Sequence, residues 1–152
     1  MMKIGIDPDC SKSGIAIKKR IVEGGLEIEG QVMSFFDLYV FLYTNQKEIK
    51  EVVIEGGWLN KKANFRIIKS VAAAERIAKN VGANHETGKK IVEMCEFLNI
   101  PHKVVPPLRK KWKGINKKIT HDELVKIIKN QNINIVNKKT NQEIRDAILL
   151  IL

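Results

Sequence analysis

Short apolar runs, separated by turn-forming residues, occupy the beginning of the chain. Residues 3–9 and 13–19 are two such runs, and Pro8, Ser11, Lys12 and Ser13, where the two runs approach each other, are typical of a turn. A third run starts at Leu26, after a double-glycine turn, and extends to Met33. This pattern predicts three consecutive antiparallel strands.

The apolar spacing then changes from a strand period to a helical period and back. Ser34 is a candidate helix cap, and Leu38, Phe41 and Leu42 follow it at helical spacing. Residues 51–56 have a continuous apolar centre, which is expected of an interior parallel strand. The predicted order so far is three strands, a helix and a fourth strand.

Two helices and one more strand follow in the middle of the chain. The helical patterns cover residues 66–81 and then a segment from Asn84, as a capping residue, to Leu98. Residues 102–105 predict a fifth strand between prolines. Gly88 costs about 1 kcal/mol relative to alanine inside a helix, so it indicates that another backbone approaches closely there.

Capping boxes predict where the last two helices begin. Thr120-x-x-Glu123 starts a helix near 121–131, and Thr140-x-x-Glu143 starts one near 141–152. The chain is therefore predicted to adopt an α/β fold. Its mixed sheet has five strands, of which the first three are antiparallel, and helices flank the sheet.

Length and composition limit the class of protein. The chain has 152 residues, of which 44% are hydrophobic and 29% charged, which predicts one globular domain over residues 1–152 and excludes a disordered, collagenous or membrane-spanning chain. Cys10 and Cys95 stand alone, without the spacing of a disulfide framework or a zinc site. No export signal or membrane anchor is visible, so we expect a cytoplasmic protein with no membrane partner.

The net charge adds a candidate partner. Lysines and arginines number 27 against 17 aspartates and glutamates, which gives a formal charge of +10. An excess of this size predicts an anionic partner, most often nucleic acid. A lysine-rich proteome is the alternative explanation, because asparagine and isoleucine are frequent as well.

Two carboxylates lie at the ends of apolar strands. Asp7 ends the first predicted strand, where aspartate is depleted and expensive to bury unless a cation or a donor binds it. Glu55 follows the apolar centre of the fourth strand. If these two strands are parallel neighbours, both carboxylates emerge at the sheet edge where α/β folds bind ligands. The alternatives are a turn aspartate before Pro8 and a solvated strand-end glutamate.

Two more carboxylates, Glu143 and Asp146, are three positions apart on the last predicted helix and project from one face. Glu143 has a capping role as its alternative, whereas no cap requires Asp146. Four carboxylates from two strands and one helix are suited to two Mg²⁺ ions, typically about 3.5–4 Å apart. Such ions activate a water and stabilise the leaving oxygen in phosphodiester hydrolysis.

Positive charge is concentrated away from these acids, because residues 61–69 and 101–119 contain no aspartate or glutamate. Trp58 is a candidate for stacking on a base, with burial in the core as the alternative. Trp112 is interpreted rather as a packing residue, and His121 as an exposed residue of a first helical turn. The candidate DNA-binding residues are Trp58, Lys61, Lys62, Arg109, Lys110, Lys111, Lys113, Lys117 and Lys118.

The run Ile4-Gly5-Ile6-Asp7-Pro8, the strand-end Glu55 and the final Glu143-x-x-Asp146-Ala together resemble the RuvC-type Holliday junction resolvases of the RNase H-like (retroviral integrase) superfamily. The order of elements matches as well, so the resemblance spans nearly the whole chain. Relatives carry an aromatic residue shortly after the strand glutamate, which Trp58 matches. The chain departs from the pattern at Glu143, where relatives often have aspartate or sometimes histidine.

This resemblance implies an RNase H-like fold and an endonuclease that resolves four-way DNA junctions by paired symmetric nicks, with Mg²⁺ or Mn²⁺. It implies that Asp7 bridges two metal ions, whose shells Glu55, Glu143 and Asp146 complete. It further implies a homodimer, since two symmetric cuts require two active sites related by a two-fold axis. The expected location is cytoplasmic, on nucleoid or viral DNA.

Three other functions stay open from the sequence. A different RNase H-like nuclease would cut RNA–DNA hybrids or flaps. A non-catalytic module would bind DNA junctions without cutting them. An actin-like ATPase or sugar kinase would use residues 7–14 as a phosphate loop, but those folds need two such lobes and 152 residues supply only one.

Overall fold

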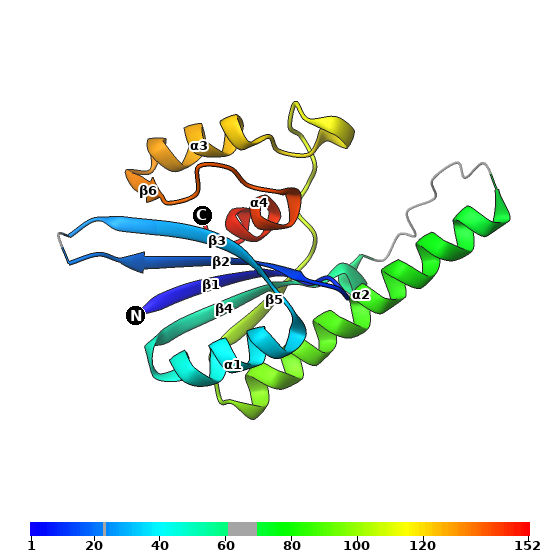
Figure 1. Ribbon diagram of the computed structural model, residues 1–152, viewed down its shortest axis with the longest axis horizontal. Helices are drawn as coiled ribbons and strands as arrows, with labels where there is room; N and C mark the ends of the chain where they lie inside the picture. The colour runs from blue at the N-terminus through cyan, green and yellow to red at the C-terminus, as the bar shows by residue number, and fades with distance from the viewer. Residues whose placement is uncertain (23, 61–69) are drawn as a thin grey trace.

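A mixed β-sheet runs through the molecule and carries helices on both faces (Figure 1). The structure is a computed structural model that describes residues 1–22, 24–60 and 70–152. Within these ranges the sheet has six strands, in the order β5-β4-β1-β2-β3-β6. The strands are β1 (Met2–Asp7), β2 (Ser13–Arg20), β3 (Leu26–Met33), β4 (Ile49–Glu55), β5 (His102–Val105) and β6 (Ile133–Ile135).

The predicted α/β class and the antiparallel start of the chain are confirmed. β1 pairs with β2, and β2 with β3, in antiparallel register. β4 lies parallel to β1, and β5 lies parallel to β4. The predicted number of five strands is wrong, because β6 pairs in parallel with β3 as a sixth strand. β6 has three residues, which is too short for alternation to distinguish it from a loop.

Helices cover both faces of the sheet (Figure 1). On one face lie α1 (Phe35–Asn45) and α2 (Val71–Phe97), and on the other lie α3 (His121–Asn130) and α4 (Gln142–Leu149). The buried apolar side chains form two cores accordingly, one between the sheet and the α1–α2 layer and one between the sheet and the α3–α4 layer.

Alternation along the strands decides which core each side chain enters. Ile6 of β1 and Ile54 of β4 belong to the core beneath α1 and α2, whereas Val53 belongs to the core beneath α3 and α4. Successive side chains of a strand point to opposite faces of the sheet. Asp7 and Glu55, each one position further, therefore point to the face that α3 and α4 cover.

The predicted starts of α1 and α3 are confirmed by their caps. Ser34 Oγ accepts a hydrogen bond from the amide of Asp37 (3.2 Å) at the start of α1. At the start of α3, Thr120 Oγ1 accepts from the amide of Glu123, and the amide of Thr120 donates to the Glu123 carboxylate (3.0 Å), which completes the capping box.

The two helices predicted over 66–81 and from Asn84 to Leu98 are one continuous helix, α2. Ser70 caps it by accepting a hydrogen bond from the amide of Ala73 (3.2 Å), and residues 66–69 lie outside the described part of the chain. Asn84 lies inside α2, so its predicted role as a cap is wrong. An amide side chain within a helix does not end it where the residues on both sides keep their helical pairing.

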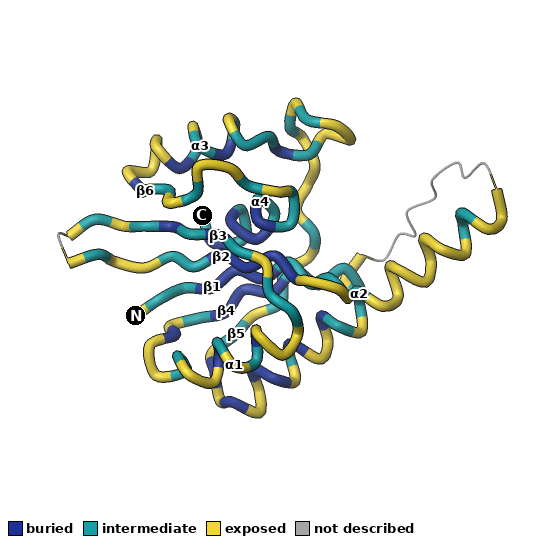
Figure 2. The backbone as a smooth tube through the Cα atoms, viewed as in Figure 1, coloured by how far each residue is buried: buried dark blue, intermediate teal, exposed yellow. Residues whose placement is uncertain are grey.

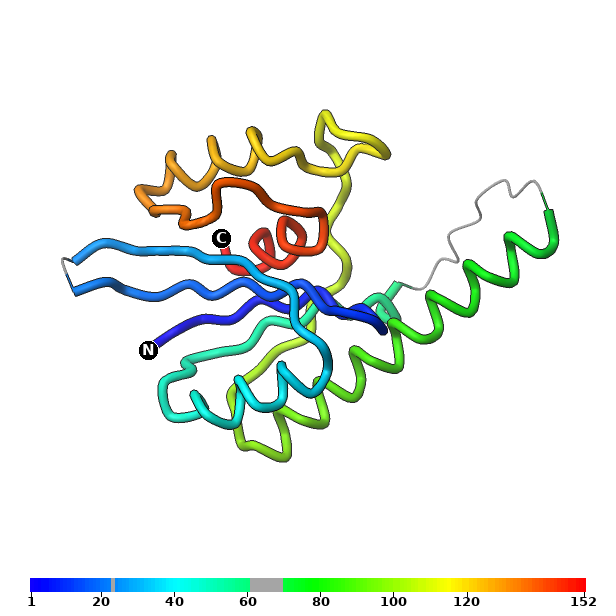
Figure 3. The backbone as a smooth tube through the Cα atoms, in the orientation of Figure 1, coloured from blue at the N-terminus to red at the C-terminus, as the bar shows by residue number. Residues whose placement is uncertain are grey.

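The first half of α2 extends beyond the edge of the sheet (Figures 1 and 3). Its side chains are mostly exposed, Val71 among them, whereas Ile91 and Cys95 in the second half are buried (Figure 2). Neither α2 nor any other helix among the described residues is both long and apolar enough to span a membrane.

Candidate active site

Asp7 and Glu55 end two neighbouring parallel strands. Ile6 of β1 is level with Ile54 of β4, so the next residue of each strand is a carboxylate at the same edge of the sheet. Both side chains are half-buried on the face that α4 covers. The expectation that the two strands are parallel neighbours is confirmed.

Two strand glycines allow α4 to reach this edge of the sheet. A Cβ atom on Gly5 of β1 would overlap the carbonyl oxygen of Ala147, and one on Gly14 of β2 would overlap the carbonyl oxygen of Glu143. Gly14 is also the cross-strand partner of Asp7. The first turn of α4 therefore lies beside the end of β1, where Asp7 is.

The cap of α4 differs from the predicted capping box of Thr140 and Glu143. Asn141 is the capping residue, and its side-chain oxygen accepts a hydrogen bond from the amide of Ile144 (2.9 Å). Asparagine caps at least as well as threonine, and Thr140 Oγ1 instead lies 2.9 Å from Nδ1 of His121, at the start of α3. The capping role, which was the alternative function of Glu143, is therefore excluded.

Asp146 follows Glu143 on α4 by one turn and is held by its neighbours. Gln142 Nε2 donates a hydrogen bond to Asp146 Oδ1 (2.6 Å). Gln142 is itself fixed, because its side-chain oxygen accepts a hydrogen bond from Arg145 (3.1 Å), which also donates to the carbonyl oxygen of Thr140. These contacts orient the Asp146 carboxylate.

One cleft brings the four predicted carboxylates together. Asp7 and Glu55 line it from the sheet, and Glu143 and Asp146 line it from α4. A loop between β5 and α3 contributes basic side chains to the same cleft. The predicted basic residues that line it are Arg109, Lys110, Lys117 and Lys118.

The other predicted DNA-binding residues have different positions. Lys111 and Lys113 are exposed on the same loop, but they are not among the residues that line the cleft. The Lys111 ammonium group lies 5.3 Å from the centre of the Trp112 ring. Trp112 packs against the core beneath α3 and α4, which agrees with its interpretation as a packing residue. Lys61 and Lys62 lie outside the described residues.

Burial and neighbouring negative charge raise the pKa values of three carboxyl groups in the cleft. Burial, followed by the negative charges of Glu55, Asp146 and Glu143, raises the pKa of Asp7 to about 8. Burial and the charge of Asp146 raise the pKa of Glu55, and burial raises the pKa of Asp146. Lys118 opposes all three shifts with its positive charge. The concentration of negative charge in the cleft favours the binding of cations.

The chemistry of the donor set fits Mg²⁺ or Mn²⁺. The four carboxylates offer only oxygen ligands, which these ions prefer, and none of the ion pairs among the described residues uses them. No three His, Cys, Asp or Glu side chains in the described part of the chain are arranged closely enough to hold a metal ion. The four carboxylates therefore line the cleft at separate positions.

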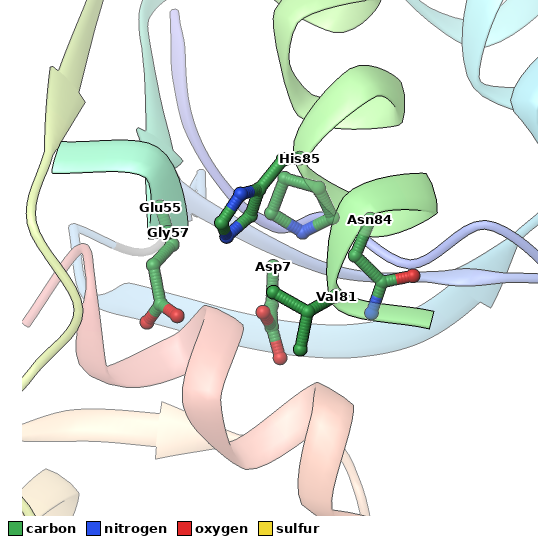
Figure 4. A pocket seen from close by; sticks show the side chains of 7 residues that line it. Asp7, Glu55, Gly57, Val81, Asn84 and His85 are labelled. Atoms are coloured by element: carbon green, nitrogen blue, oxygen red, sulfur yellow. The ribbon is translucent and has the colours of Figure 1, made fainter. Parts of the chain in front are cut away.

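Two polar residues of α2 also face the cleft, although they were not predicted as site residues. Figure 4 shows Asn84 and His85 around the same cavity as Asp7. Asn84 Oδ1 accepts a hydrogen bond from the amide of Cys10 (2.9 Å), and its Nδ2 donates to Asp9 (3.2 Å). α2 therefore holds the loop that directly follows Asp7. The sequence did not reveal this contact because a capping role already explained Asn84.

Trp58 packs against α2. A Cβ atom on Gly88 would lie 2.5 Å from Cζ3 of Trp58, and the ring of His85 meets the indole edge to face, with 6.4 Å between the ring centres. The close approach predicted at Gly88 is therefore made by an indole ring, so the prediction of another backbone there is wrong. Trp58 is half-buried, and its contact with a base stays a prediction.

Comparison with known proteins identifies the fold. Neither protein-family models nor curated proteins match the sequence. Among solved structures, Thermus thermophilus RuvC matches with a TM-score of 0.54 and 13% identity, over 99% of this chain and 90% of that chain. T. thermophilus RuvC in complex with a Holliday junction substrate matches with a TM-score of 0.53 and 12% identity, over the same 99% and 90%. The fowlpox virus Holliday junction resolvase matches with a TM-score of 0.49 and 12% identity, over 99% of this chain and 94% of that chain. The two RuvC matches show that the chain has the fold of RuvC-type Holliday junction resolvases over nearly its full length.

Proposed function

We propose that the chain is a metal-dependent endodeoxyribonuclease that resolves four-way DNA junctions by paired, symmetric nicks. The observation that carries this proposal is the cleft in which carboxylates from β1, β4 and α4 face a basic loop. The RuvC-type fold supports it, since a RuvC of this fold is solved in complex with a Holliday junction substrate.

In the proposed reaction, Asp7, Glu55, Glu143 and Asp146 hold two Mg²⁺ ions, for which Mn²⁺ substitutes because it accepts the same oxygen ligands. When bound, such ions activate the attacking water and stabilise the leaving oxygen of a phosphodiester. Lys118 acts electrostatically on three of these carboxylates. This proximity supports Lys118 as a candidate for binding the scissile phosphate beside them.

The exposed basic residues of the β5–α3 loop hold the DNA backbone on either side of the cut. Such contacts carry no sequence information, and they make the affinity fall steeply as salt rises. Lys117→Ala reduces the slope of the salt dependence by about one. Lys47→Ala is the control, because Lys47 is exposed near the opposite end of β4 and its removal leaves the slope unchanged.

Cleavage assays on a panel of substrates test the proposal. The protein is incubated with Mg²⁺ and a four-way junction, a linear duplex, a flap or an RNA–DNA hybrid. We expect paired nicks in the junction and little cutting of the others. Asp7→Asn abolishes cleavage but leaves junction binding largely intact. Glu96→Gln, which removes an exposed carboxylate on α2, keeps the wild-type rate.

Two results would redirect the assignment. A preference for the hybrid or the flap identifies a different nuclease with the same fold. Junction binding without any cleavage in Mg²⁺ or Mn²⁺ identifies a non-catalytic junction-binding module. If Asp7→Asn nicks at the wild-type rate, Asp7 has no part in the reaction.

The projecting half of α2 supports a homodimer. Val71, Ala74 and Ala78 form one stripe at helical spacing, and Val71 is 76% exposed. An isolated helical segment is marginally stable in water unless an apolar face is covered. A second copy of the chain, related by a two-fold axis, covers the stripe and supplies the second active site for a paired cut.

Two alanines on α2 give a matched test of this interface. Ala78→Glu places a charge in the apolar stripe, and Ala83→Glu places the same charge on the opposite, exposed face. We expect Ala78→Glu to sediment as a monomer and to lose paired nicking, whereas Ala83→Glu remains a dimer. A wild-type protein that sediments as a monomer at micromolar concentration, with or without junction DNA, contradicts the proposed homodimer.

A further inference from the structure

The loop between β5 and α3 folds back on itself over residues 112–118. The amide of Trp112 donates to the carbonyl oxygen of Lys117 (3.0 Å), and the amide of Gly114 donates to that of Lys118 (3.0 Å). Trp112 anchors the base of the loop in the core beneath α3 and α4. The loop is therefore a fixed projection of the surface.

The tip of this loop has an unfavourable backbone conformation. Asn116 and Lys117 are consecutive residues with φ angles of 55° and 58°, in the left-handed region, which asparagine tolerates and lysine disfavours. The amide of Lys113 donates to the carboxylate of Glu123 on α3 (3.1 Å), which holds the loop in this shape. Such conformations persist where surrounding contacts enforce them, and they are concentrated at binding sites.

Ile115 occupies the tip and is 87% exposed. Single exposed apolar side chains are common on protein surfaces, so exposure alone assigns no role to it. The position of Ile115 indicates a role, because the next residues, Asn116 and Lys117, line the cleft that holds the carboxylates. Residues 101–119 contain no acid, so the apolar tip is surrounded along the chain by positive charge alone.

We propose that Ile115 is an apolar wedge that enters the DNA at the branch point of a four-way junction and separates two stacked bases. This inference rests on the proposed function, because DNA is the anionic partner that the shared cleft selects. Aliphatic side chains act in this way in proteins that kink DNA. The flanking lysines bind phosphates and thereby direct the tip of the loop toward the bases.

A branch point is a favourable place for such a wedge. The base pairs that border it stack on one another less completely than those inside a duplex, so separating them costs less free energy. Ile115 therefore adds to junction affinity and adds little to the affinity for linear duplex. It contributes shape selectivity, which phosphate contacts alone do not provide.

The wedge is tested by binding without divalent ions, which separates it from catalysis. The probe is a four-way junction with 2-aminopurine at the branch point, which brightens when the base is unstacked. We expect wild-type protein to increase its fluorescence and Ile115→Ala to abolish the increase. Ile115→Ala also weakens junction binding about tenfold, in proportion to the apolar surface it removes, and changes duplex binding less than twofold. Ile115→Leu retains both properties.

Val22→Ala is the matched control. Val22 is an exposed aliphatic residue, and it follows the end of β2 opposite to the end that pairs with Asp7. Equal melting temperatures establish that the variants are folded. Unchanged fluorescence and junction affinity in Ile115→Ala overturn the wedge. Equal losses on junction and duplex also overturn it. If wild-type protein increases the fluorescence of the probe but does not cleave the junction in Mg²⁺, the nuclease proposal is contradicted and the wedge is still supported.

Discussion

The carbonyl group of Glu143 rests directly against Gly14, the residue that pairs with Asp7 across β1 and β2. A carboxylate of α4 is thus brought to the end of β1 by backbone contact, with no side chain between helix and sheet. Gly5 and Ala147 repeat this contact further along α4. Gly5 and Gly14, which have no side chain, therefore determine how closely the carboxylates of α4 approach Asp7.

Gly14→Ala is expected to separate α4 from the sheet. The added methyl group overlaps the Glu143 carbonyl, so the helix shifts and the free energy of unfolding falls by about 1–3 kcal/mol. Displacing catalytic groups by about 1 Å costs on the order of 100-fold in rate. Urea denaturation measures the first effect, and single-turnover cleavage of a four-way junction measures the second.

Gly25→Ala is the control for this substitution. A Cβ atom at Gly25 would meet only the Ile21 side chain, at 3.4 Å, and Gly25 follows the end of β2 that is far from Asp7, so alanine there leaves the cleavage rate unchanged. A Gly14→Ala protein with wild-type stability and rate would show that the contact with Glu143 does not position the site.

The part of the fold that local patterns determine could be predicted from the sequence. Alternation placed Asp7 and Glu55 at the ends of apolar strands, and the structure confirms that these strands are parallel neighbours. Two helix starts were predicted from caps, but the cap of α4 was not, because Thr140 and Asn141 are both good capping residues. The contact of Thr140 with His121 on α3 decided between them.

Features that depend on contacts between residues far apart in the sequence could not be predicted from local sequence patterns. β6 forms because its three residues pair with the edge of β3. The two strands are at least 100 positions apart in the sequence. Asn84 serves the loop after Asp7, 74 and 75 residues away, and no local motif marks such a pair. The indole of Trp58 fills the space at Gly88, where the sequence indicated only that something approaches.

Without divalent cations, the stability of the protein is expected to fall as pH rises. Burial and neighbouring carboxylates raise the pKa of Asp7 to about 8, whereas an unfolded aspartate has a pKa of about 3.9. Between these values the folded state binds more protons than the unfolded state, so the free energy of unfolding decreases with pH. The raised pKa values of Glu55 and Asp146 act in the same direction.

Melting temperatures in EDTA between pH 5 and pH 8 measure this effect. Asp7→Asn flattens the pH dependence and melts at a higher temperature than wild type at pH 8, by about 2–4 °C for each kcal/mol gained. Glu96→Gln, an exposed position on α2, leaves the dependence unchanged. A wild-type melting temperature that rises across this range would contradict the raised pKa of Asp7.

Mg²⁺ is expected to raise the melting temperature at pH 8, because it binds the ionised carboxylates of the folded state and not the dispersed ones of the unfolded chain. At 100 times its dissociation constant the gain is about 2.7 kcal/mol. The double substitution Asp7→Asn and Asp146→Asn abolishes this gain, whereas Glu96→Gln retains it. Stabilisation of equal size in the double variant would place the cations elsewhere.

Asn84→Ala is expected to release the β1–β2 loop from α2. It removes hydrogen bonds to the amide of Cys10 and to Asp9, at a cost of about 1–3 kcal/mol in the free energy of unfolding. Cleavage slows while junction affinity changes little, because no phosphate contact is lost. Asn80→Ala, on the exposed part of the same helix, is the control. Equal rates for the two variants would remove Asn84 from the positioning of Asp7.

Cys10 offers a direct test of where the junction binds. Its thiol is exposed on the loop after Asp7, whereas Cys95 is buried, and burial raises the pKa of Cys95 to about 12. Iodoacetamide, which reacts with thiolates, is therefore expected to modify Cys10 alone. Junction DNA in EDTA slows this modification, and an equal mass of linear duplex slows it less, as measured by mass spectrometry. Cys10→Ser takes up no label and still cuts the junction. If bound junction leaves the labelling rate of Cys10 unchanged, the DNA does not cover this edge of the sheet.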